Sequence, residues 1–177
     1  MYRLVPKQNY QIEQSIVDEN HKKAEKYIPA ILGQIRTYKA NMENKDYNIA
    51  CSSAEQVAEM SLKAVARKGG RFSNTLENGH DLNKIANCCP ETFNEINKQD
   101  LKDLRNGYYA KYPNQPTHKT YNNREKAIDL GNKAMKIADM ALSELDVSNG
   151  TLDKEIGVLN NITNVMDISL WNRLCIK

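Results

Sequence analysis

Apolar residues recur at spacings of three and four along every long segment of this chain. That spacing places side chains on one face of an α-helix, whereas strict alternation would place them on one face of a strand. No run of β-branched residues alternates with polar ones, and glycine and proline cluster at a few places between the periodic segments. The pattern therefore predicts an all-α protein.

The first periodic region covers residues 11–41 and contains Pro29, which removes a backbone donor and predicts a break near Tyr27. A second helix is expected over residues 47–68, with a narrow stripe of small and apolar residues on one side. On its other side, Glu59 and Lys63 are expected to form an ion pair in solvent. Gly69 and Gly70 predict the end of this helix.

Residues 71–79 are expected to form a loop, followed by a short helix over 81–88. A longer helix ending near Gly107 should bury Phe93, Ile96, Leu101, Leu104 and Tyr108. Residues 112–121 predict an exposed polar loop, because two prolines interrupt them. An alanine-rich helix is expected over 123–145, and an amphipathic segment follows residue 148. Nothing repeats and no long linker occurs, so residues 1–177 are expected to form one domain.

The composition excludes several classes of protein. A charged fraction of 27% with a net charge of +3 is too balanced to predict a nucleic-acid or membrane partner from bulk charge. No apolar run approaches the length of a membrane helix and no secretory signal begins the chain, so we expect a cytoplasmic protein. The four cysteines lack zinc-ligand spacing and are expected to be reduced, and we expect neither a metal nor a cofactor.

Three motifs and the alanine-rich helix that follows them, in this order, resemble features of the HEPN family of small helical domains. Residues 56–64 read QVAEMSLKA, which is similar to the family signature Q-x-A-E-x-x-L-K-A. His80-Asp81-Leu82 is similar to its H-D-L, and Arg105 leads to Tyr112-Pro113 as in its R/K-Y-P. The resemblance covers about 27–145. It implies an up-and-down antiparallel bundle of four to five helices, here with an extra C-terminal helix over 148–177, and commonly a homodimer.

The resemblance also bears on catalysis. HEPN ribonucleases need no metal and use an arginine to stabilise the phosphate and a histidine, four to six residues later, to transfer protons. Arg105-Asn106 begins this pattern, but Ala110, Lys111 and Tyr112 occupy the places where the histidine would stand. The chain is therefore expected to be a non-catalytic or degenerate member. Tyr112 matches the tyrosine that a partner nucleotidyltransferase modifies in toxin–antitoxin members, and is thus a candidate modification acceptor.

Tyrosines and cations lie close together near the end of the predicted helix before Pro113. The tyrosine rings can stack on the bases of RNA or a nucleotide while the cations neutralise its phosphates, and the same residues can equally form a dimer interface. These residues are Arg105, Tyr108, Tyr109, Lys111 and Tyr112.

The leading hypothesis is a binding module of a toxin–antitoxin or defence-type system, with RNA, a nucleotide or a nucleotidyltransferase chain as its partner. One alternative is an active endoribonuclease whose proton donor is His80 or His118. Another is the substrate-binding half of a split nucleotidyltransferase.

Overall fold

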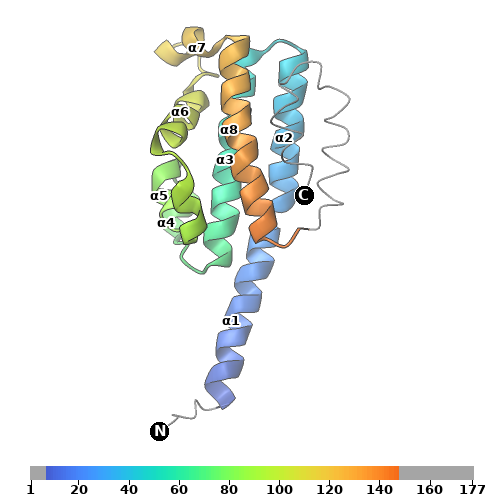
Figure 1. The fold of residues 1–177 in the computed structure, drawn as a ribbon, viewed down its shortest axis with the longest axis vertical. Helices are drawn as coiled ribbons and strands as arrows, with labels where there is room; N and C mark the ends of the chain where they lie inside the picture. Colours follow the sequence, from blue (N-terminus) through green and yellow to red (C-terminus); the bar gives the residue numbers. More distant parts are fainter. Residues whose placement is uncertain (1–6, 148–177) are drawn as a thin grey trace. The chain divides into compact units, whose positions relative to one another are not determined.

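Helices account for all the regular structure in the part of the chain that can be described. The computed structural model describes the backbone of residues 7–147, and within this range it contains eight α-helices, one 3-10 helix and no strand (Figure 1). The predicted all-α class is confirmed. The amphipathic segment predicted after residue 148 lies outside the described residues. No described helix combines the length and the apolar character that crossing a membrane requires.

The predicted break at Pro29 separates the first two helices. Helix α1 spans Lys7–Glu25 and helix α2 spans Ile28–Glu43. Pro29 lies in the first turn of α2, where a backbone N–H has no helical acceptor, so proline costs nothing there. Ile31, Ile35 and Tyr38 form the buried side of α2.

Helix α3, Tyr47–Lys68, is the centre of the bundle. Helices α1, α2, α6 and α8 all contact it, and Figure 1 shows it between α2 on one side and α6 on the other. Most of its side chains are buried, including Glu59 and Lys63, and this explains why one expectation was wrong. Glu59 and Lys63 are 3% and 6% exposed and form a buried pair rather than a pair in solvent. The polar side of the helix is covered by the chain that follows it.

The segment after α3 is more regular than expected in one place and less in another. The predicted loop 71–79 contains a single turn, α4 (Asn74–Glu77), and α5 spans Leu82–Ala86. The single long helix predicted next is instead a 3-10 helix, η1 (Glu91–Glu95), and helix α6 (Lys98–Tyr109). The division falls at Asn97, whose side chain accepts a hydrogen bond from the backbone N–H of Gln99 at 2.8 Å and so caps α6.

The predicted exposed loop 112–121 is corrected as well. Its second half forms helix α7, Pro116–Tyr121, with proline in the first turn. Tyr121 is buried, and its carbonyl accepts a hydrogen bond from the Cys51 thiol of α3 at 3.5 Å. A tyrosine packed against α3 thus anchors a segment whose composition alone is that of a surface loop.

Helix α8, Arg124–Glu144, matches the prediction and packs closely on α2 and α3. The Tyr38 hydroxyl of α2 donates to the Ala127 carbonyl of α8 at 3.0 Å. The ring lies against Gly131, where a Cβ atom would come within 2.1 Å of the hydroxyl oxygen. Glycine is therefore required at this crossing because of the tyrosine.

Candidate functional site

Two carboxylates on α3 form the base of the site. Glu55 and Glu59 lie four residues apart, so both project from the same face of the helix. Glu59 Oε1 is 2.7 Å from Lys63 Nζ, one turn further on. The same ammonium donates to the Glu77 carbonyl of α4 at 2.7 Å. Lys63 therefore compensates the charge of Glu59 and also ties α4 to α3.

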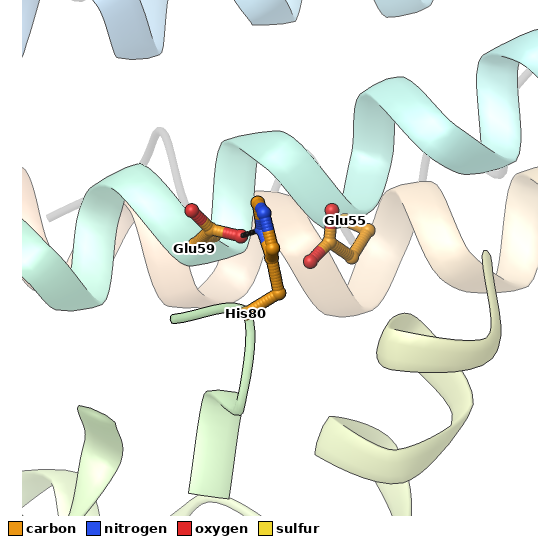
Figure 2. A group of neighbouring side chains, drawn as sticks. All are labelled: Glu55, Glu59 and His80. Carbon is orange, nitrogen blue, oxygen red and sulfur yellow. Dashed lines mark hydrogen bonds and ion pairs between the residues drawn. The ribbon is translucent and has the colours of Figure 1, made fainter. Parts of the chain in front are cut away.

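The loop before α5 adds an imidazole to these carboxylates. His80 Nδ1 lies 2.6 Å from Glu59 Oε2, and Figure 2 shows the ring between Glu59 and Glu55. The side chain of His80 is 49% exposed, so one side of the ring faces solvent. One ligating atom from each of Glu55, Glu59 and His80 lies within 4.8 Å of the others. We call these three residues the carboxylate cluster.

Glu55 is the unusual member of the carboxylate cluster. It is completely buried, and its Oε2 accepts a hydrogen bond from Gln56 Nε2 at 2.6 Å. No donor among the described residues reaches its Oε1. Burial and the nearby charge of Glu59 raise the pKa of Glu55 to about 8. At neutral pH the Glu55 carboxyl therefore keeps its proton unless a cation takes the place of that proton.

The C-terminal end of α6 forms a second part of the site, which we call the tyrosine face. Lys111 Nζ lies 4.0 Å from the centroid of the Tyr108 ring and 5.3 Å from that of Tyr112. The Tyr108 and Tyr112 hydroxyls are hydrogen-bonded at 3.3 Å, and this bond raises the pKa of Tyr108 to about 12. Tyr109 and Tyr112 are 38% and 42% exposed. With Arg105, these four residues make up the tyrosine face.

His80 and Asp81 join the two parts. The His80 ring stacks on Tyr108 with centroids 4.9 Å apart and planes 26° from parallel. Asp81 Oδ2 lies 3.9 Å from Arg105 Nη1, and the guanidinium is 46% exposed. The structure thus brings together six of the predicted site residues from two segments of the chain, namely His80, Arg105, Tyr108, Tyr109, Lys111 and Tyr112. Asn106 is half-buried and interacts with the Tyr121 hydroxyl instead.

The position that the resemblance assigns to the family histidine lies inside the bundle. Ala110 is 0% exposed, and its carbonyl accepts a hydrogen bond from His118 Nδ1 at 2.7 Å. A larger side chain at Ala110 would have to displace core atoms. This bond connects His118, on α7, to the C-terminal end of α6. His118 is not part of the carboxylate cluster.

Sequence reasoning missed both carboxylates. A signal was present, since Glu55, Glu59 and Lys63 follow one another at intervals of four in a helix rich in small and apolar residues. Such a charged stripe on a helix is ordinarily its solvent side, and only the covering loop at His80 reverses that interpretation.

The basic residues at the C-terminal end of α3 make contacts within the fold. Arg67 pairs with Glu77 at 3.0 Å and lies over the Phe72 ring, 4.5 Å from its centroid. Lys68 donates to the Glu144 carbonyl of α8. Gly70, at φ +67°, adopts the left-handed conformation that ends the helix. These contacts agree with the helix terminus that the sequence predicts here.

Asp81 holds the start of α5, which gives a first prediction. Its side chain accepts the Lys84 backbone N–H at 3.3 Å, so Asp81→Ala should lower the free energy of unfolding by about 1 kcal/mol. Asp81→Asn retains the capping oxygen and should stay close to wild type. Urea denaturation of the two variants measures the difference, and equal losses would mean that the charge pairing with Arg105, not the cap, is what matters.

Comparison with known proteins gives one match. The family profile described as HEPN domain matches residues 32–145. The searches of curated proteins and of solved structures found no match. The matched region includes α3, the carboxylate cluster, the tyrosine face and α8, and it extends over more than half of the sequence. This chain belongs to the HEPN domain family.

Proposed function

We propose that this HEPN domain binds single-stranded RNA through the tyrosine face. HEPN domains are associated with nucleic-acid binding or with ribonuclease activity. The observation that carries the proposal is the pair of exposed rings, Tyr109 and Tyr112, beside the Lys111 ammonium and the half-exposed Arg105. Aromatic rings stack on bases and cations neutralise the phosphates between them.

The geometry around Ala110 supports binding without the family's Arg–His cleavage chemistry. That chemistry needs an imidazole placed on the same surface as Arg105. The equivalent position is fully buried and occupied by alanine, so no imidazole can be presented from it. Arg105 remains exposed, which leaves it able to contact a phosphate.

Fluorescence anisotropy with a short labelled single-stranded RNA tests the proposal, in chelator so that no metal contributes. Tyr109→Ala and Tyr112→Ala should each weaken binding by about tenfold, the loss of one stacked base. Lys111→Gln should weaken binding and reduce the slope of log K against log salt by about one.

Lys136→Gln is the matched control, because it removes one exposed lysine from α8, away from the tyrosine face. It should change affinity little. If all four variants bind alike, or if wild type shows no salt-dependent binding, the tyrosine face is not an RNA site.

A second candidate function, ribonuclease activity with His80 as the proton-transfer group, is favoured by the Glu59–His80 bond. A carboxylate bonded to an imidazole orients the ring for proton abstraction, and Arg105 lies beside the adjoining Asp81. Incubation of labelled RNA in chelator should then yield fragments with wild type. Both His80→Gln and Arg105→Ala should abolish them, and intact RNA with wild type would rule this function out.

The proposed setting is a toxin–antitoxin or defence-type system in which the chain forms a homodimer and meets a nucleotidyltransferase chain. Tyr112 supports this setting as a modification acceptor, since it is 42% exposed on the same surface. Transfer of AMP from ATP to its hydroxyl, with release of pyrophosphate, would place negative charge on the tyrosine face and should reduce RNA affinity. Intact mass after incubation with ATP and such an enzyme detects the change, and Tyr112→Phe should prevent it.

A further inference from the structure

We propose that the carboxylate cluster, Glu55, Glu59 and His80, is a binding site for one zinc ion. The inference goes beyond RNA binding and is independent of it. Two carboxylates four residues apart on α3 and an imidazole from the next loop converge on one point, as Figure 2 shows.

The donor set selects the metal. Mg²⁺ and Ca²⁺ prefer oxygen ligands alone, whereas an imidazole among the ligands suits zinc and its neighbours. Three protein ligands with an open fourth position are also the usual arrangement of a non-structural zinc site. The exposed side of His80 leaves that fourth position accessible to solvent.

Glu55 is the observation that requires an occupant. Its carboxylate is aimed at the His80 ring, it is completely buried, and its Oε1 has no donor among the residues described. An ionised carboxylate in such a place is costly unless a positive charge faces it. The competing occupant is a proton shared with Glu59, and the experiment must distinguish the two.

The distances allow zinc to enter with small movements. Zinc bonds of about 2.0–2.2 Å in a tetrahedron place the ligand atoms about 3.4 Å apart. The ligand atoms of the cluster now lie within 4.8 Å of one another, and the His80–Glu59 pair is closer, at 2.6 Å. Zinc entry requires a rotation of the Glu55 side chain and a small shift of the loop carrying His80, with the metal replacing the proton between His80 and Glu59.

The neighbouring lysine is compatible with a metal. Lys63 Nζ bonds Glu59 Oε1, so Oε2 is the atom left for zinc. Two ionised carboxylates and one lysine carry one net negative charge, which a divalent ion changes to one positive charge. The fourth position should therefore accept a hydroxide or another anion rather than a cation.

The test uses the full chain, freed of metal by chelator and titrated with Zn²⁺ by calorimetry and with Co²⁺ as a spectroscopic probe. Wild type should bind about one ion per chain. Its Co²⁺ complex should show the intense visible bands of four-coordination without the ultraviolet band of thiolate ligation. Glu55→Gln and His80→Gln should each weaken zinc binding by at least about tenfold.

Cysteines provide the control, because a thiolate binds zinc strongly and could account for binding elsewhere in the chain. Cys51 and Cys89 are buried, so a Cys88→Ser, Cys175→Ser double variant removes the two remaining thiols and should bind zinc like wild type. Circular dichroism verifies that each variant is folded. Zinc binding unchanged in Glu55→Gln and His80→Gln, lost in the cysteine variant, or absent from wild type would overturn the proposal and leave the proton as the occupant.

Discussion

In chelator, Glu55→Gln should melt at a higher temperature than wild type at about pH 9, and the difference should disappear near pH 4. The folded chain holds the Glu55 pKa at about 8, against an ordinary value of 4.5. The unfolded chain therefore gives up this proton more readily than the folded one does.

The sign follows from that order. Below pH 4.5 both states keep the proton and the residue makes no difference to stability. As pH rises toward 8 the unfolded state releases its proton first, so wild type loses stability continuously up to and through the pKa of the folded state. Glutamine has no proton to lose, and its amide can donate to Glu59.

Burial of the Glu55 carboxyl makes the largest contribution to the effect, and the charged groups that face it modify its size. Glu59 on α3 opposes a second negative charge, whereas Lys111, at the end of α6, favours it. The loop residue His80 and the Tyr108 hydroxyl also lie close by. A penalty on the order of a few kcal/mol at pH 9 would raise the melting temperature of the variant by about 5–10 °C.

Thermal melts at a series of pH values measure this effect. Glu95→Gln serves as the control, because it removes a carboxylate from an exposed position on η1. Its melting curve should run parallel to that of wild type across the range. If Glu55→Gln also runs parallel, Glu55 is ionised in the folded chain at neutral pH and the description of the cluster as proton-sharing is wrong.

Among glycine-to-alanine substitutions in the described bundle, Gly131→Ala should lower the free energy of unfolding most. The new Cβ would lie 2.1 Å from the Tyr38 hydroxyl oxygen and 2.4 Å from the carbon that bears it. Tyr38 is 3% exposed and cannot move into solvent. The ring must shift, and its hydrogen bond to Ala127 is lost, so we expect a loss of about 2–4 kcal/mol.

Gly33→Ala is the matched control in α2. A Cβ there meets nothing within 4 Å, so the usual preference of a helix for alanine over glycine should apply without a clash. The free energy of unfolding should rise by up to about 1 kcal/mol. Urea denaturation of both variants should therefore give changes of opposite sign. A loss in both would show that helix geometry, rather than the contact with Tyr38, accounts for the effect at Gly131.

The helices were predictable from sequence where local signals and tertiary packing agree. Pro29 separates α1 from α2 as predicted, and the small residues of α8 face α3. The predictions were wrong where packing overrides composition. Tyr121 packs against α3, so the polar segment that carries it forms helix α7. Asn97 caps a new helix within a stretch whose apolar spacing predicts a single helix.

The site was predictable only in part, for a related reason. The cations and tyrosines at the end of α6 are near neighbours in sequence, so their clustering follows from helix geometry. His80 is 21 residues from Glu59, and their contact depends on how the loop folds back over α3. Periodicity indicates that Glu59 and Lys63 lie on the same side of the helix, but not whether another segment of the chain covers that side.

The central place of α3 has a consequence for how the molecule opens. Helices α1, α2, α5, α6, α7 and α8 all contact it, so its amides become accessible only when several of these helices separate together. Hydrogen exchange along α3 should then proceed at one slow, uniform rate that reports global unfolding, while α4 and α7, at the margins, exchange through local openings. The two carboxylates of the cluster would thus lie on the helix that unfolds last.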